Sequence, residues 1–353
     1  MKLSKLARLV FVLSILILGA YALAASAAGG YHLIKKVPLA VAPGGGQYFD
    51  YILVDPDARR VYVSHGTEVV VLNADDYSVV GTIQDPRFKR VHGVALVKAM
   101  NKGFISDGEA MSAFVFDIKT MKVTGEVKTN QPDTDSIIYE PATKRIFTFN
   151  GSSHNTTVID PEKEAVIKNI DLIGSVEFPA VDGKGMVYDN NEDKNDVVAI
   201  DAKTLEIKNR WPVAPEGQAV ALAIDVKNRR LFSAGRKPQF LVMMDADKGN
   251  VIQSFPISGG VDAISFEAAT GMVFVSTREG FIHIFHEDSP EKLSEVETVK
   301  TEYGAKTMAV DPKTHALFLS TSDFDPPAAP TEKQPNPLPR ANPNNFRVLV
   351  YNR

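Results

Sequence analysis

The sequence predicts an all-β fold, a seven-bladed β-propeller whose last blade is completed by a strand from the N-terminal part of the chain. Two observations lead to this prediction. One is a repeat with a period near 43 residues, and the other is a match between an N-terminal segment and the last strand of the repeats. Each repeat contains an anchor residue that ends a short apolar run. Successive anchors are 42 to 44 residues apart: Asp55, Val97, Glu140, Asp182, Asp225, Glu267 and Asp311.

Each anchor is followed by a turn and then by a run of β-branched and aromatic residues, which indicates a strand. These runs occupy residues 60–64, 102–106, 145–148, 185–188, 230–233, 272–276 and 317–320. In most repeats a third run ends in a polar turn, and a fourth strand follows. Four strands in a repeat of about 40 to 45 residues are typical of a propeller blade.

Ring closure is a separate prediction. The last repeat ends with residues 348–353, its third strand, so its outermost strand must come from elsewhere. Residues 33–40 match the fourth strands at 207–214 and 251–258 position by position, including a proline. Proline is tolerated on an edge strand, where the missing N–H has no ladder partner. We therefore expect residues 33–40 to complete the seventh blade.

Composition limits the function classes. The chain has 353 residues, of which 44% are hydrophobic, so it can bury a large core. With 39 basic against 43 acidic residues, there is no excess charge for a phosphate backbone, and no basic groove with interleaved aromatic residues is visible. We expect no nucleic-acid partner. The absence of cysteine excludes disulfides and thiolate chemistry.

The pattern of residues 1–27 predicts a cleaved signal peptide. Three basic side chains precede an apolar run at 9–18, and Ala25-Ser26-Ala27 fits a cleavage site. The alternative is an uncleaved membrane anchor, but the run is shorter than the roughly 20 residues that span a bilayer. We predict a periplasmic or secreted protein, a monomer, with no stable membrane insertion after cleavage. Residues 28–353 then form a single propeller domain.

An insertion interrupts the last repeat between its second and third strands. Residues 323–346 contain seven prolines in 24 residues, so we expect an extended loop with few hydrogen bonds. It should lie on the face that holds the candidate site. Two interpretations stay open: a lid or partner-docking arm, and an inert disordered loop.

The candidate site is the mouth of the central channel, where the loops that enter the inner strands converge. Counting five residues back from each anchor gives one position per blade: Asp50, His92, Asp135, Glu177, Val220, Asp262 and Lys306. Four converging carboxylates repel one another unless a metal ion, a cationic ligand, Lys306 or protonated His92 compensates them. Other loops of this face add further candidate ligand-binding residues: His65, Asn150, Asn190, Arg236 and Arg278.

Three roles are open for these positions: bonding to a neighbouring blade, holding a metal, and direct ligand contact. His92, Asp135 and Glu177 are the candidate metal ligands. Oxygen-rich surroundings favour Ca²⁺ or Mg²⁺, although this set also suits a transition metal. Arg236 and Arg278 occupy equivalent points in neighbouring repeats, where guanidinium groups can bind an anion.

The repeats resemble the YVTN-type seven-bladed propeller family. Tyr62-Val63-Ser64-His65 and Phe274-Val275-Ser276-Thr277 are degenerate forms of its signature. The chain is most similar to the YncE-like exported members, through Asn150-Gly151, Asp262-Ala263 and the segment 304–309. This resemblance implies a fold and a binding platform, since most members lack an assigned activity. A WD40 interpretation is disfavoured, because the single tryptophan, Trp211, precedes a proline.

Two function classes follow. The first is an exported binding or scaffold protein that uses the channel mouth to bind a partner protein, a small polar ligand or a cation. The alternative is a metal-dependent lactonase-like or lyase-like enzyme, in which an ion polarises a carbonyl while a carboxylate or His65 acts as base. No catalytic residue is assigned, because neither a nucleophile elbow nor a zinc-protease motif is present.

Overall fold

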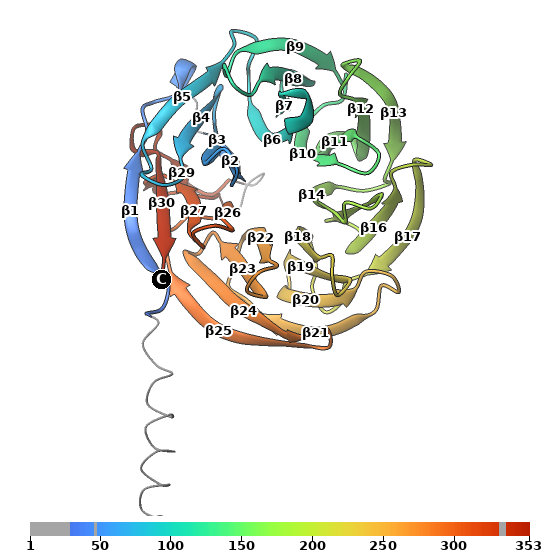
Figure 1. Cartoon of the computed structure of the whole chain (residues 1–353). Helices are drawn as coiled ribbons and strands as arrows, with labels where there is room; N and C mark the ends of the chain where they lie inside the picture. Colours follow the sequence, from blue (N-terminus) through green and yellow to red (C-terminus); the bar gives the residue numbers. More distant parts are fainter. Residues whose placement is uncertain (1–28, 46–47, 332–336) are drawn as a thin grey trace, which may run out of the picture.

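Seven four-stranded antiparallel sheets are arranged in a ring around a central channel (Figure 1). The computed structural model describes residues 29–45, 48–331 and 337–353. The predicted seven-bladed all-β propeller is confirmed. The predicted signal peptide, residues 1–27, lies outside the described residues. In the described part of the chain, no helix has both the length and the apolar character needed to cross a membrane.

In the first six blades, four consecutive strands run from the channel outward. Blade 1 comprises β2 (Phe49–Asp55), β3 (Arg60–His65), β4 (Glu68–Asn73) and β5 (Val79–Gln84). Blade 2 comprises β6 (Val91–Val97), β7 (Lys102–Asp107), β8 (Ser112–Asp117) and β9 (Val123–Lys128). Blade 3 comprises β10 (Thr134–Glu140), β11 (Arg145–Asn150), β12 (Asn155–Asp160) and β13 (Ala165–Asp171).

The next three blades repeat this order. Blade 4 comprises β14 (Val176–Val181), β15 (Met186–Asn191), β16 (Asp196–Asp201) and β17 (Glu206–Pro212). Blade 5 comprises β18 (Ala219–Asp225), β19 (Arg230–Arg236), β20 (Gln239–Asp245) and β21 (Val251–Pro256). Blade 6 comprises β22 (Val261–Glu267), β23 (Met272–Thr277), β24 (Phe281–Ser289) and β25 (Lys292–Lys300). Helical structure in the described residues is limited to four 3-10 turns: η1 (Pro43–Gly45), η2 (Lys98–Met100), η3 (Gly151–Ser153) and η4 (Pro343–Asn345).

Blade 7 is built from both ends of the chain. Its order from the channel outward is β26 (Met308–Val310), β27 (Leu317–Thr321), β30 (Arg347–Asn352) and β1 (His32–Pro38). β1 pairs antiparallel with β30, from His32 opposite Asn352 to Pro38 opposite Arg347. The N-terminal strand therefore completes the last blade, as the repeat pattern predicts. Pro38 lies on the outermost strand, where its missing N–H breaks no ladder.

The hydrophobic core is divided among the seven interfaces between neighbouring blades. Each interface holds one cluster of buried apolar side chains, such as Phe104 with Ile146 between blades 2 and 3. This follows from the two-residue period of a strand, which points alternate side chains at the preceding and the following blade. The packed interfaces hold the inner strands in place around the channel.

Polar contacts reinforce these interfaces at the turns that follow the inner strands. The Arg59 guanidinium of blade 1 donates two hydrogen bonds to the Asp311 carboxylate of blade 7, at 2.9 and 2.7 Å. Asp311 also accepts a hydrogen bond from the backbone N–H of Lys313 in its own turn. An anchor carboxylate thus caps a turn and binds the neighbouring blade.

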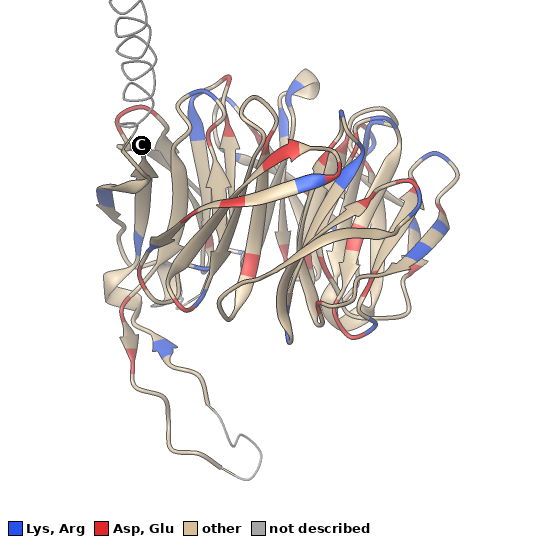
Figure 2. Cartoon of the chain, turned by 90° about the horizontal axis from the view of Figure 1, so that it is seen from below, with Lys and Arg blue, Asp and Glu red and all other residues tan. Residues whose placement is uncertain are grey.

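The proline-rich insertion projects from the ring beside blade 7 (Figure 2). Its base forms a small sheet, in which β28 (Phe324–Asp325) pairs with β29 (Arg340–Ala341). Asp323 accepts further hydrogen bonds from Arg347 and Asn345, each at 2.8 Å. The base of the loop is therefore held more firmly than its proline content predicts.

Candidate functional site

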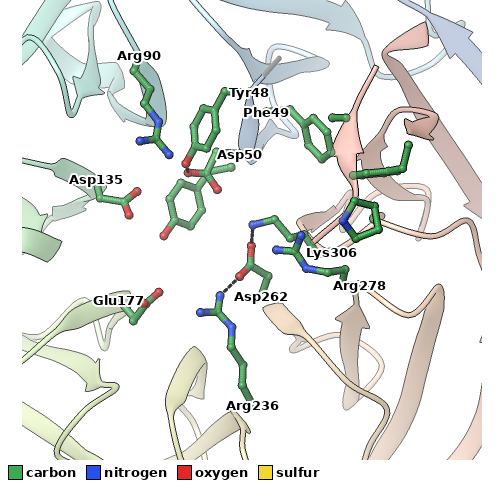
Figure 3. A pocket seen from close by; sticks show the side chains of 15 residues that line it. Tyr48, Phe49, Asp50, Arg90, Asp135, Glu177, Arg236, Asp262, Arg278 and Lys306 are labelled. Carbon is green, nitrogen blue, oxygen red and sulfur yellow. Dashed lines mark hydrogen bonds and ion pairs between the residues drawn. The ribbon is translucent and has the colours of Figure 1, made fainter. Parts of the chain in front are cut away.

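The inner strands begin, and the second strands end, around one mouth of the channel. A cavity of about 380 Å³ opens there, lined by side chains from these strand ends. Seven of the eleven predicted ligand-binding residues lie on its wall (Figure 3): Asp50, Asp135, Glu177, Arg236, Asp262, Arg278 and Lys306. Phe324, Pro339 and Ala341 of the insertion also contribute, so the insertion lies on the same face as the site.

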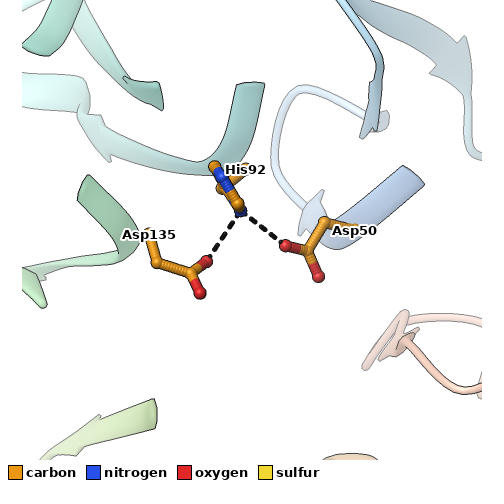
Figure 4. A group of neighbouring side chains, drawn as sticks. All are labelled: Asp50, His92 and Asp135. Carbon is orange, nitrogen blue, oxygen red and sulfur yellow. Dashed lines mark hydrogen bonds and ion pairs between the residues drawn. The ribbon is translucent and has the colours of Figure 1, made fainter. Parts of the chain in front are cut away.

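His92 joins two of the carboxylates. Its Nδ1 lies 2.8 Å from Asp50 Oδ2 and 2.9 Å from Asp135 Oδ1 (Figure 4). The Tyr48 hydroxyl lies 2.9 Å from the same nitrogen. The His92 side chain is only 1% exposed, and a Cβ at Gly108 would come within 2.7 Å of Nε2. A glycine at position 108 therefore leaves room for the ring.

These contacts make His92 a cation in the folded protein. Burial acts to lower the pKa of the imidazole and is the largest single influence. The charges and hydrogen bonds of Asp135 and Asp50 together outweigh it and raise the pKa of His92 from 6.5 to about 10. Burial in turn raises the pKa of the Asp135 carboxyl, and the His92 charge opposes that rise. A protein side chain thus offsets the repulsion between the two carboxylates.

Asp262 is compensated in a similar way on the opposite side of the mouth. It accepts hydrogen bonds from Arg236 of blade 5 and from Lys306 of blade 7 (Figure 3). Burial alone would raise the pKa of Asp262, but the charges of Lys306 and Arg236 lower it below its usual value. Arg236 also pairs with Glu192 at 3.4 Å. Arg236 is therefore bound within the protein.

Among the described residues, three charged side chains of the mouth form no ion pair: Arg90, whose guanidinium lies over the Tyr48 ring, Glu177 and Arg278. Among the described residues, neither the Glu177 carboxyl nor the Arg278 guanidinium forms a hydrogen bond or an ion pair, and both are partly buried. They lie on opposite sides of the cavity (Figure 3). Burial raises the pKa of Glu177 well above its usual value, and the charge of Arg236 opposes that rise. An acid and a base that lack a direct ion-pair partner are therefore separated across the mouth.

The predicted metal site differs from the group that the structure brings together. The candidate ligand atoms that lie within 4.8 Å of one another belong to Asp50, His92 and Asp135, and Glu177 is not in this group. Three donors fall short of the roughly six to eight oxygen ligands that Ca²⁺ takes. A transition ion would have to displace the proton from Nδ1, which lies toward both carboxylates. The donor set therefore fits an ion pair better than Ca²⁺.

Four predicted residues do not line the cavity: His92, which lies behind Asp50 and Asp135, and three residues with other contacts. His65 is buried and stacks on Phe346, with ring centroids 4.0 Å apart. Asn150 is buried and bonds within its own blade. Asn190 is buried and donates a hydrogen bond of 2.9 Å to the carbonyl of Ala221 in the next blade. These contacts give the three side chains packing and hydrogen-bonding roles in the ring.

Three polar side chains of the cavity are not predicted from the sequence: Tyr48, Tyr51 and Arg90. The Arg90 guanidinium lies 4.0 Å from the centroid of the Tyr48 ring, a cation–π contact. Tyr48 precedes Asp50 by two residues, and Arg90 precedes His92 by two. Since alternate residues of an extended chain share a face, this spacing is a signal for Tyr48 and Arg90, whereas Tyr51, one residue after Asp50, carries no such signal.

Comparison with known proteins supports the fold and does not identify a function. No protein-family model and no curated protein matches the chain. A chain in "Crystal Structure of Mitotic Checkpoint Complex" superposes with a TM-score of 0.71 at 12% identity, over 91% of each chain. At that identity the similarity shows the fold alone. Because 1777 chains of solved structures match, the architecture itself does not specify a ligand.

Proposed function

We propose that the protein is a binding protein whose channel mouth takes a small dipolar ligand, one that carries both a cationic and an anionic group. The observation that carries this proposal is the separation of Glu177 and Arg278, each without an ion-pair partner among the described residues, across one cavity. An ammonium group would lie beside Glu177, and a carboxylate would lie beside Arg278. A guanidinium offers paired donors to such a carboxylate.

The charge balance of the mouth supports a dipolar ligand over a single ion. Its wall carries four carboxylates and four basic side chains: Asp50, Asp135, Glu177, Asp262, Arg90, Arg236, Arg278 and Lys306. A lone anion or cation would meet groups of its own sign. A buried charge without a partner of opposite sign is unfavourable. A ligand that carries both charges would pair with Glu177 at one end and with Arg278 at the other, and both contacts would favour binding.

Calorimetric titration tests the proposal. The probe is glycylglycine, compared with N-acetylglycine, which keeps only the negative charge, and glycinamide, which keeps only the positive charge. We expect glycylglycine to bind at least about tenfold more tightly than either, because each charged hydrogen bond contributes on the order of 1.5–3 kcal/mol. Equal affinities for the three probes, or no binding of glycylglycine, would overturn the proposal.

Variants locate the binding. Glu177→Gln and Arg278→Met should each weaken glycylglycine binding by about tenfold. The matched controls, Glu291→Gln and Lys163→Met, alter exposed side chains outside the mouth and should leave the affinity unchanged. A bound ammonium group favours ionised Glu177, so the native protein should release protons on binding. Titration in two buffers of different ionisation enthalpy measures that release, and Glu177→Gln should lack it.

The family and the location belong to the same proposal. The YVTN-type, YncE-like motifs and the signal-peptide pattern of residues 1–27 support an exported, periplasmic or secreted binding protein. N-terminal sequencing of the protein recovered from outside the cytoplasm tests this location. A chain that still begins at Met1 would contradict cleavage.

A metal-dependent lactonase-like or lyase-like activity is the second candidate. The convergence of Asp50, His92 and Asp135 supports it. A base role for His65 gains no support, because that ring is buried against Phe346. Metal analysis of the purified protein, with thermal unfolding measured before and after chelation, separates the candidates. A bound ion and a lower melting temperature after chelation would favour the enzyme.

A further inference from the structure

A second cavity, of about 370 Å³, lies along the channel against the inner strands of blades 1 to 4. Its wall is mainly apolar and includes Leu53 on β2, Leu96 on β6 and Ile138 on β10. All three side chains are partly exposed to the channel space. Ligand pockets commonly enclose about 300–1,000 Å³ and are mostly apolar with a few polar groups. The cavity has the size and the lining of a site for part of a small molecule.

Tyr51 connects this cavity to the mouth, because its side chain lines both. The ring packs against Phe178 on the wall of the apolar cavity, with centroids 5.3 Å apart. The hydroxyl forms no hydrogen bond with another described residue. The side chain shares the wall of the mouth with Asp50 and Asp135, and burial together with these charges raises the pKa of Tyr51 well above 10. A ligand bound at the mouth thus has apolar surface directly beside it.

Away from the mouth, the described wall of the apolar cavity has no charged side chain without an ion-pair partner. Lys98 is the one basic side chain on its wall, and its Nζ lies 2.5 Å from Asp55 and 3.0 Å from Asp57. An anionic amphiphile that entered from this side would have to displace both carboxylates. The charged groups of a ligand are therefore better matched at the mouth, with only its apolar part inside the channel.

We propose that the apolar cavity receives an apolar side chain of the dipolar ligand, so that the site selects short peptides or amino acids with a large apolar side chain. This inference rests on the proposed function, since the ligand is held by Glu177 and Arg278 at the mouth. Contact of the ligand's side chain with Leu53, Leu96 and Ile138 would remove the apolar surface of the ligand and that of the cavity wall from water. Burial of one methylene strengthens binding by up to roughly fourfold.

Calorimetry with a matched peptide series tests the selection. The probes are glycylglycine, glycylleucine, leucylglycine and the polar analogue glycylglutamine. At least one leucine peptide should bind tenfold or more tightly than glycylglycine, while glycylglutamine should gain little. Equal affinities for all four would overturn this inference and leave dipolar binding intact. Failure of all four to bind would overturn the proposed function together with this inference.

Variants place the apolar part of the ligand. Leu96→Gln should reduce the leucine preference about tenfold and leave glycylglycine affinity unchanged. Leu33→Gln makes the same change on the outer strand β1, where the side chain is 36% exposed, and should keep the preference. Ile138→Trp fills the cavity and provides an independent check if Leu96→Gln does not fold. A leucine preference that survives in the folded channel variants would overturn the inference.

Discussion

His92 Nδ1 lies 2.8 Å from Asp50 Oδ2, so an imidazole of the second blade binds a carboxylate of the first at the channel mouth. The same nitrogen lies 2.9 Å from Asp135 on the third blade. One side chain thereby links three neighbouring sheets. Its positive charge lies between the two carboxylates, which is one of the ways of compensating them that the sequence leaves open, beside a metal ion, a cationic ligand and Lys306.

Replacing His92 by glutamine should destabilise the fold. Two buried or partly buried carboxylates, Asp50 and Asp135, would then face each other without a cation. Loss of one partner from a buried ion pair typically costs about 3–5 kcal/mol. Urea unfolding of His92→Gln at neutral pH measures the loss. His32→Gln, at an exposed position of β1, is the control, and equal stabilities of the two variants would contradict this role.

The contribution of His92 to the free energy of unfolding should be lost at alkaline pH. Its pKa is about 10 in the folded protein against 6.5 for the free group. Because the folded value is the higher one, the stabilisation is fully present below pH 6.5 and is lost as pH rises toward 10. The difference in unfolding free energy between the native protein and His92→Gln should therefore shrink across this interval. A difference that stays constant up to pH 10 would show that His92 is not the titrating cation.

Closure of the ring should depend on Arg59. Arg59→Met removes both hydrogen bonds to Asp311, whose side chain is fully buried, at the junction of blades 1 and 7. We expect a loss of about 1.5–3 kcal/mol in the free energy of unfolding. Denaturant unfolding measures it, with Lys163→Met, at an exposed turn, as the control. A native-like midpoint for Arg59→Met would indicate that apolar packing alone holds this junction.

The fold could be predicted because every blade repeats the same physical requirement. Each inner strand must end in a turn, and a carboxylate such as Asp55 accepts the N–H groups of that turn, so anchors recur at a fixed spacing. Closure can be predicted for a similar reason, since Pro38, Pro212 and Pro256 each occupy the last part of an outermost strand, where an edge strand tolerates proline. Requirements of this kind act within one turn or one strand, so they can be recognised in the sequence.

The candidate site was predictable only in part. Spacing placed Glu177 and His92 at the same level of the ring, but it does not tell which side chains touch, and His92 meets Asp50 instead of Glu177. Asn150 and Asn190 lie at strand ends near the mouth, yet both side chains bond inside the ring. These differences arise from side-chain direction and from contacts between blades, which depend on the assembled tertiary structure.

The pairing of β1 with β30 has a mechanical consequence. The strands are antiparallel, so the outer ends of both, His32 and Asn352, form one terminal pair on the rim. A force that pulled the two ends of the chain apart would act on that pair first and break the remaining pairs one after another, like a zipper, at low load. Tension would thus open the circle at its seam while the other six sheets stayed intact.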